Sequence, residues 1–235
     1  MAHAINSRGE SIVTANPILP TLDAYDRWAA SYPPWPHNPL MRAEQKAMLE
    51  QWPDVAGRRA LDLACGTGRY AKLLAQGGAS EVFAVDFSAA MLRQVPAGSA
   101  VRADMMRLPF IDEAFGIVIS GLALGHATEV RRWMGEIGRV LKGGGILLYS
   151  DFHPEAARAG LTRSFKDERD LDFTLSHCSY GLRVQREAIA AANLTLEVVH
   201  EVRVGVDLQE EFPGSDAFYR QWHGLPLVLI VRARK

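Results

Sequence analysis

The sequence predicts an α/β fold: a doubly wound, mostly parallel sheet of seven strands that is Rossmann-like. Three observations predict it. Apolar strand-like runs alternate with helical segments over residues 58–152, as in parallel sheets with crossover helices. A glycine-rich turn at residues 65–68 joins a buried strand to a helix. Finally, residues 196–204 and 226–231 read as strands with no helix between them, which predicts a C-terminal antiparallel hairpin.

The elements follow in chain order. Tyr25, Trp28 and Tyr32 are spaced for one helix face, and the prolines after Tyr32 end that helix. Ser88 is a typical helix N-cap. The other predicted helices cover residues 39–51, 71–76, 129–141, ended by glycines 143–145, and 184–192; the other predicted strands cover residues 60–63, 82–85, 99–103, 115–119 and 146–149. We expect no clear strand in residues 153–180 and a polar loop over residues 207–223.

The 235 residues suit one domain, residues 1–235, with a core large enough for this fold. We divide it into a flexible lead-in (1–20), an N-terminal helical lid (21–52), a core (58–152), a cover inserted after strand five (153–181), and a C-terminal helix and hairpin (182–235). The core holds the glycine-rich turn, and the lid and cover are expected to lie over the strand ends.

Composition excludes several classes of function. The net charge is −1 and acids and bases are interspersed, so no basic face for nucleic acid is expected. Two cysteines give neither a disulfide framework nor a metal spacing, which favours reduced thiols in a cytoplasmic protein without a metal. No apolar run has the length of a membrane span. We expect a monomer or homodimer that acts on a small molecule.

The turn predicts a nucleoside-containing cofactor, because Asp86 follows the second strand where a carboxylate accepts hydrogen bonds from ribose. The spacing of Gly66, Gly68 and Ala71 also fits a loose dinucleotide motif. S-adenosylmethionine is favoured because Asp62, before the turn, suits an ammonium and would repel a pyrophosphate. Asp104 ends the third strand, where it suits the adenine amine. The chain is short for a dehydrogenase with a separate substrate domain, and it contains no Tyr-x-x-x-Lys pair.

Several segments together resemble class I S-adenosylmethionine-dependent methyltransferases. These are the run LDLACGTG at residues 61–68, Asp86 after its strand, Asp104 with the LPF run at residues 108–110, and the VLKGGG run at residues 140–145. The chain is most similar to the small-molecule, type 11 group, which includes quinone C-methyltransferases and malonyl-carrier-protein O-methyltransferases. The resemblance covers residues 25–149 and implies methyl transfer to a small-molecule acceptor, as in secondary metabolism. Ala64 stands where the family often has glycine. Alanine is tolerated there if the residue keeps strand dihedrals, whereas a positive φ would weaken the cofactor interpretation.

The resemblance and the strand ends give a set of candidate residues. Tyr25 and Tyr32 could belong to the lid or to an ordinary amphipathic helix, and Trp28 is expected to pack in the core. Predicted cofactor-binding residues are Tyr25, Asp62, Ala64, Cys65, Gly66, Gly68, Asp86, Phe87, Met91, Asp104, Met105, Ser120 and Gly121; predicted substrate-binding residues are Tyr32, Trp35 and His177.

His126 and His153 follow the fourth and fifth strands, so they are the candidate catalytic bases. An incidental loop position is the alternative for each. Arg163, Lys166 and Arg169 in the cover are interpreted as a solvated charged face, with binding of an acidic substrate as the alternative. Two other functions stay open for the chain as a whole: an NAD(P)-dependent oxidoreductase and a non-catalytic S-adenosylmethionine-binding regulator.

Overall fold

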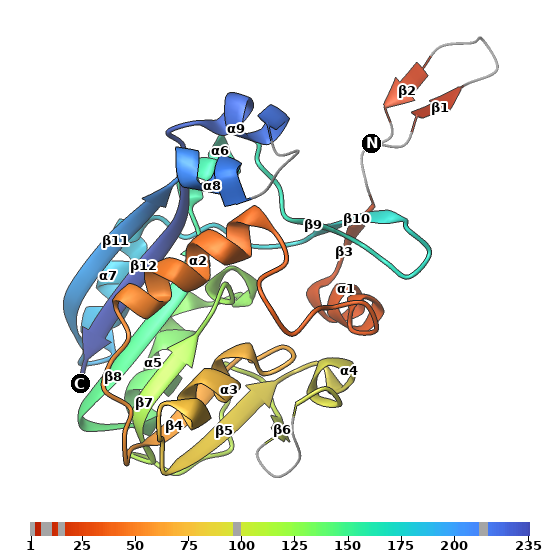
Figure 1. Ribbon diagram of the computed structural model, residues 1–235. Coiled ribbons are helices and arrows are strands. Elements are labelled where there is room, and N and C mark those ends of the chain that lie inside the picture. The colour runs from red at the N-terminus through yellow and green to blue at the C-terminus, as the bar shows by residue number, and fades with distance from the viewer. Residues whose placement is uncertain (1–2, 6–10, 14–16, 96–99, 212–215) are drawn as a thin grey trace.

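A seven-stranded sheet forms the centre of the computed structural model, which describes residues 3–5, 11–13, 17–95, 100–211 and 216–235 (Figure 1). The strand order is β11-β12-β8-β7-β4-β5-β6. The strands are β4 (Arg59–Leu63), β5 (Glu81–Asp86), β6 (Ala100–Arg102), β7 (Phe115–Ser120), β8 (Leu141–Phe152), β11 (Thr195–Arg203) and β12 (Pro226–Arg234). The predicted fold class is confirmed.

The sheet changes direction only at its C-terminal strand. β4 to β8 pair in parallel, whereas β12 runs antiparallel to both β8 and β11. The order also reverses at β4, the first strand of the sheet in sequence, whose neighbours are β5 and β7. In an open α/β sheet, ligands bind beyond the carboxyl ends of the strands at such a switch point.

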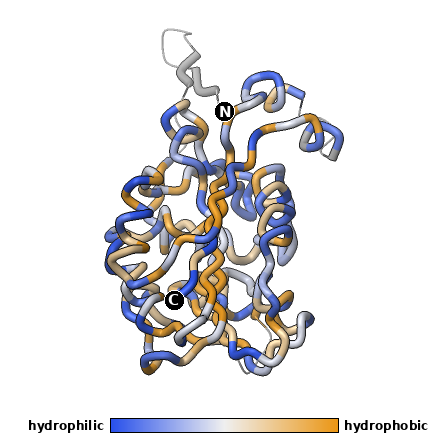
Figure 2. The backbone as a smooth tube through the Cα atoms, turned by 90° about the vertical axis from the view of Figure 1, so that its left-hand side faces the viewer, coloured by the Kyte–Doolittle hydropathy of each residue, from blue (hydrophilic) through white to orange (hydrophobic). Residues whose placement is uncertain are grey.

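Helices cover both faces of the sheet (Figure 2). The helices and short helical turns of the described chain are α1 (Thr21–Trp28), α2 (Pro39–Glu50), α3 (Arg69–Gln76), α4 (Ala89–Leu92), η1 (Leu124–His126), α5 (Val130–Val140), α6 (Pro154–Arg158), α7 (Leu182–Ala191), α8 (Val206–Glu211) and α9 (Asp216–Trp222). Among the described residues, α1 to α5 and α7 lie where helices were predicted, whereas η1, α6, α8 and α9 were not predicted. None of the described helices is long and apolar enough to cross a bilayer.

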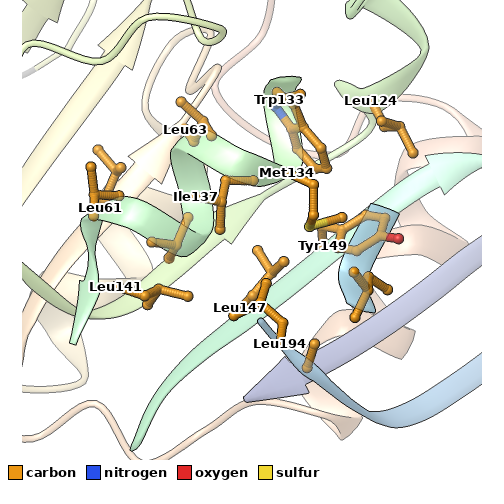
Figure 3. Close-up of a cluster of buried hydrophobic side chains, with 14 of the residues drawn as sticks. Leu61, Leu63, Leu124, Trp133, Met134, Ile137, Leu141, Leu147, Tyr149 and Leu194 are labelled. Carbon is orange, nitrogen blue, oxygen red and sulfur yellow. The ribbon is translucent and has the colours of Figure 1, made fainter. Parts of the chain in front are cut away.

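Strand alternation divides the apolar side chains between two cores. Leu61 and Leu147 point to one face, where α5 places Trp133, Met134 and Ile137 against them (Figure 3). All five side chains are fully buried. Neighbouring residues such as Ile117, Ile119 and Leu148 belong to the second core, which packs against α2 and α3. Both faces are therefore apolar, as expected for a parallel sheet covered by helices.

The glycines at 143–145 do not end α5 as predicted. β8 begins before them, at Leu141, and its register with β7 shifts between the pairs Phe115–Leu141 and Ile117–Ile146. The intervening residues form a bulge, with Gly144 at a φ of 73°. The helix ends at Val140, where Leu141 takes an extended conformation with a ψ of 138°.

Two further expectations were wrong. The cover contains a strand pair, β9 (Ser164–Lys166) and β10 (Asp172–Leu175), and β10 also pairs with β3 (Ile18–Leu19). The predicted loop over residues 207–223 contains α8 and α9. In both segments apolar residues are few and the elements are short, so their periodicity is weak. Within the lead-in, β1 (His3–Ile5) pairs with β2 (Ser11–Val13), while residues 1–2, 6–10 and 14–16 lie outside the described chain.

The helix α1 lies across from α4, close to β3 and β10 (Figure 1). Ala24 and Trp28 of α1 are buried with Phe165 and Phe173 of the cover and Met91 of α4. A hydrogen bond from the Ser88 hydroxyl to Asp26 (2.5 Å) ties α1 to the start of α4. Trp28 is thus a core residue, as predicted. The N-terminal helix and the cover form one layer, which we call the roof.

Candidate functional site

A cavity of about 360 Å³ lies between the roof and the carboxyl ends of β4, β5 and β7. This volume is in the range of small-molecule sites. The cavity brings together twelve of the predicted site residues: Tyr25, Tyr32, Asp62, Ala64, Cys65, Gly66, Asp86, Phe87, Asp104, Met105, Gly121 and His126. These residues come from segments up to about 100 positions apart, so the fold assembles the site that the strand ends predicted.

The turn after β4 has a left-handed backbone at three positions. Gly66 and Gly68 have φ of 55° and 81°, and Ala64 has φ of 55°. Ala64 therefore does not keep strand dihedrals, and on this point the structure counts against the cofactor interpretation. An alanine in this conformation costs about 1–2 kcal/mol relative to a right-handed one, and the tight turn imposes it. A Cβ built on Gly66 meets no atom within 4 Å, so the backbone there is open to a ligand.

Asp86 closes the turn from the neighbouring strand. Its Oδ2 accepts a hydrogen bond from the backbone N–H of Gly66 (2.8 Å), and its Oδ1 accepts one from Ser88 (2.8 Å). Burial raises the pKa of this carboxyl, and the two N–H donors oppose that shift. Each carboxylate oxygen has a second lone pair, so Asp86 can shape the loop and still accept ligand hydroxyls.

Asp62 lies at the floor of the cavity and is only 1% exposed. Its Oδ2 accepts a hydrogen bond from the backbone N–H of Ala71 (2.7 Å), in the first turn of α3. Burial raises the pKa of Asp62 to about 7. A cation placed beside it would favour the ionised form. The geometry gives Asp62 a structural contact with α3 and leaves it on the cavity wall.

The outer end of the cavity is more open. Phe87 is 52% exposed although it lines the cavity. Asp104, also exposed, accepts a hydrogen bond from the backbone N–H of Met106 (2.8 Å) through one oxygen. Met105 also lines the cavity. An aromatic ring, a thioether and a carboxylate at one edge suit a flat, amine-bearing heterocycle.

Thr67 gives an independent sign of a ligand. It is 5% exposed and lines the cavity, and its hydroxyl has no hydrogen-bond partner among the residues that the structure describes. Buried hydroxyl groups in native proteins are nearly always hydrogen-bonded. A polar ligand atom beside the turn would supply such a partner.

A buried ionic network supports the inner wall. Glu44 of α2 accepts hydrogen bonds from Arg69 (2.7 Å), from the hydroxyl of Tyr70 (2.6 Å) and from the hydroxyl of Ser150 (2.6 Å). The Arg69 guanidinium also lies over the Tyr70 ring at 4.4 Å. Because Glu44 is fully buried, removing Arg69 would leave the Glu44 carboxylate as an unpaired buried charge. The network fixes α2 to α3 and β8.

His126 lies under the roof in a cluster with Tyr25 and Arg163. The Tyr25 hydroxyl is 3.0 Å from His126 Nε2, and the nearest Arg163 nitrogen is 3.3 Å from the same atom. Burial, followed by the charge of Arg163, lowers the pKa of His126 to about 3. The imidazole is therefore neutral at physiological pH and weak as a general base.

Six predicted residues do not line the cavity. Gly68 turns into α3 as its N-cap, Met91 is fully buried under α1, and Ser120 donates its hydroxyl hydrogen bond to Leu63 O (2.9 Å). His153 caps α6 by accepting from the N–H of Glu155 (3.1 Å), and its Nε2 lies 3.6 Å from Glu201. Trp35 is 60% exposed, and His177 packs against the Phe152 ring.

Some lining residues were missed as site residues by sequence reasoning. They include Thr21, Thr67, Arg69, Tyr70, Ser88 and Leu122. Arg163 was interpreted as part of a solvated face, with binding of an acidic substrate as the alternative, and it lines the cavity. Thr67 lies inside the glycine-rich run, and Arg69 and Tyr70 open the helix after it, so position in the motif was an available signal. Thr21 and Arg163 belong to the roof, where no motif marks the inward side. Among the described residues, no three metal-ligating side chains gather.

Part of the chain that lines the cavity is similar to a known protein family. Residues 61–149 match a family described as a methyltransferase domain. This segment carries the glycine-rich turn, Asp62, Asp86, Asp104 and His126. The predicted resemblance to methyltransferases is confirmed for residues 61–149.

Individual relatives agree with the family match. The chain is 43% identical over 105 residues to a demethylmenaquinone methyltransferase of Clavibacter sepedonicus, covering 42% of each protein. It is 33% identical over 131 residues to a malonyl-[acyl-carrier protein] O-methyltransferase of Enterobacter lignolyticus, covering 52% of each. The matched region thus spans about half the length of these curated relatives.

A solved S-adenosylmethionine-dependent methyltransferase from Mesorhizobium loti has the same fold as residues 61–149 and their flanking elements. The TM-score is 0.66 at 24% identity, over 82% of this chain and 98% of that one. The likeness extends beyond the matched segment of residues 61–149, and it confirms the predicted Rossmann-like architecture.

Proposed function

We propose that this protein transfers a methyl group from S-adenosylmethionine to a small-molecule acceptor by in-line displacement. One observation carries the proposal: where residues 61–149 match a methyltransferase domain, a cavity joins an open left-handed glycine turn to Asp86 and to the unpartnered hydroxyl of Thr67. Neither alternative, a nicotinamide-dependent oxidoreductase or a non-catalytic regulator, has support from the relatives.

The donor set fits the three parts of this cofactor. Asp86 is the acceptor for the ribose hydroxyls, and its second lone pairs are available beside the turn. Asp62 is the partner for the methionine ammonium, whose charge would compensate a buried carboxylate. Phe87, Met105 and Asp104 form the adenine end. When bound, the cofactor supplies a methyl group on a positively charged sulfur.

The chain's own residues then position the acceptor and exclude water. The roof closes the cavity with Tyr25, Tyr32 and Arg163, and Gly121 and Leu122 form the wall after β7. Holding two reactants in line accounts for roughly 7–11 kcal/mol of barrier reduction in good intramolecular models. His126 does not serve as a strong base, since its pKa is about 3. The proposed catalysis therefore rests on positioning.

We extend the proposal to the organisation of the whole chain. Residues 1–235 are one domain in which residues 58–152 bind the cofactor and the roof selects the acceptor. The name of the demethylmenaquinone methyltransferase favours a small organic acceptor. A cytoplasmic monomer or homodimer without nucleic-acid or membrane partners fits the balanced charge and the free thiols of Cys65 and Cys178.

Calorimetry on the full chain tests the proposal. S-adenosylhomocysteine, the demethylated product, should bind with one site per chain, and NADH should not compete. A Thr67→Val variant, which removes the orphan hydroxyl at nearly constant volume, should bind the product more weakly, by up to about tenfold. Tight NADH binding without product binding would overturn the proposal.

A further inference from the structure

The Arg163 side chain brings a positive charge to the roof of the cavity. It lies directly before β9, and one guanidinium nitrogen donates to the backbone carbonyl of Leu122 (3.0 Å). The same nitrogen lies 3.3 Å from His126 Nε2, and the second lies 3.4 Å from the Tyr25 hydroxyl. All three partners are neutral groups.

This charge has no counter-ion close by. Among the described residues, no carboxylate oxygen lies within 4.0 Å of Arg163, whereas Arg69, the other cation of the lining, is paired with Glu44 at 2.7 Å. Asp151 acts on Arg163 only as a more distant charge. Lys166 and Arg169, its neighbours in the cover, are exposed and do not line the cavity. A partly buried guanidinium without a carboxylate is costly unless a ligand pairs with it.

The hydrogen bonds around His126 leave one donor free for a ligand. Because arginine only donates, His126 Nε2 is an acceptor and Nδ1 carries the proton, 3.4 Å from the Thr21 hydroxyl. The single lone pair of Nε2 is approached by both the Tyr25 hydroxyl and Arg163. One of these two donors is therefore in surplus and can turn to a ligand oxygen.

The charges of the cavity are divided along its length. Asp62, Asp86 and Asp104 line the cofactor end, and the unpaired Arg163 lines the roof. From this division we propose that the acceptor carries an ionised oxygen, a carboxylate or an acidic phenol or enol, which binds Arg163 and Tyr25 under the roof. The inference rests on the proposed methyl transfer and names the acceptor's chemical class. An acceptor already ionised also needs no proton removed, which suits a site whose histidine is a weak base.

A paired binding panel tests the proposal with the full chain saturated by S-adenosylhomocysteine. The panel holds aromatic and aliphatic carboxylates with their carboxamides, and phenols at a pH where they are ionised with their methyl ethers. Melting-temperature shifts find binders, and calorimetry measures them. In each pair that binds, the ionised compound should have a dissociation constant about tenfold lower than its neutral partner, or lower still. Comparing the carboxylate pairs with the phenol pairs shows which kind of ionised oxygen the site prefers.

Variants link the preference to its cause. Arg163→Gln should abolish the preference for the ionised member, and Arg163→Lys should retain part of it because the charge remains. Arg169→Gln, an exposed arginine of the same cover, is the matched control and should behave as wild type. Affinity for S-adenosylhomocysteine should stay within about twofold in all three. Equal binding of charged and neutral members, no binding by any acid, or an unchanged preference in Arg163→Gln would overturn this inference. Loss of product binding by the wild type would overturn the proposed function instead.

Discussion

Replacing Asp86 with alanine should separate the role of this carboxylate in the turn from its role in binding. The change removes the acceptor for two backbone N–H groups, those of Gly66 and Ser88, both at 2.8 Å. Hydrogen bonds to charged groups contribute about 1.5–3 kcal/mol each. Water reaching the vacated space would recover part of that loss, so we expect about 2–4 kcal/mol of lost unfolding free energy.

Binding should weaken further through the ligand itself. Loss of one charge-assisted hydrogen bond to a ribose hydroxyl corresponds to at least about 1.4 kcal/mol, a factor of ten in the dissociation constant. Calorimetry with S-adenosylhomocysteine measures this factor at a temperature where urea titration shows the variant to be folded. The expected outcome is a folded protein with at least about tenfold weaker binding.

The matched control is Asp54→Ala. Asp54 is exposed, and like Asp86 it accepts a hydrogen bond from the chain itself, from the N–H of Ala56 (3.1 Å), but it is not part of the cavity lining. Its loss should leave product affinity unchanged. If folded Asp86→Ala bound the product as tightly as the control, the ribose assignment and the magnitude derived from it would both be refuted.

Three more predictions concern backbone, packing and pH. Ala64→Gly should raise the unfolding free energy by about 1 kcal/mol in urea titrations, since the φ of 55° is strained for alanine; lower stability would contradict the strain. Gly121→Ala should lose about 1–3 kcal/mol and bind product less well, because the new Cβ would lie 2.4 Å from the Tyr70 ring, whereas the control Gly135→Ala in α5 meets nothing within 4 Å. Burial raises the pKa of Asp151 from 3.8 to about 7. Between these two pH values the folded state binds more protons than the unfolded state, so the unfolding free energy falls as the pH rises from 3.8 to about 7. Asp151→Asn should flatten that fall by up to about 1.4 kcal/mol per pH unit in melting curves, and an unchanged slope would contradict the assignment.

The part of the cavity at the strand ends was predictable because its signals are local. Gly66 and Gly68 mark a turn that needs a left-handed backbone, and Asp86 follows a strand of apolar residues that fixes its position at the sheet edge. Parallel strands bring such ends together whatever the connecting helices contain. The conformation of Ala64 was not predictable, because alanine rarely adopts a positive φ and so gives no sequence signal for one.

The roof was harder to predict because its pairing is not local. Phe165 and Phe173 are buried on short strands whose neighbours are charged or polar, so alternation over three or four residues does not stand out. The two histidines show the same limit. Both follow strands, yet His126 faces the cavity while His153 caps α6, and only the path of the backbone after each strand decides between these outcomes.

The roof also sets an order for assembly. Tyr25 and Arg163 touch across 138 positions of sequence, and β3 finds its strand partner only in β10. During synthesis the first helix leaves the ribosome long before the segment that will shelter Trp28. Trp28 therefore stays exposed until the segment with Phe165 and Phe173 has been synthesised. Contacts between distant segments form late because closing a long loop is entropically costly. The pocket is therefore complete only after the N-terminal helix and the cover have come together.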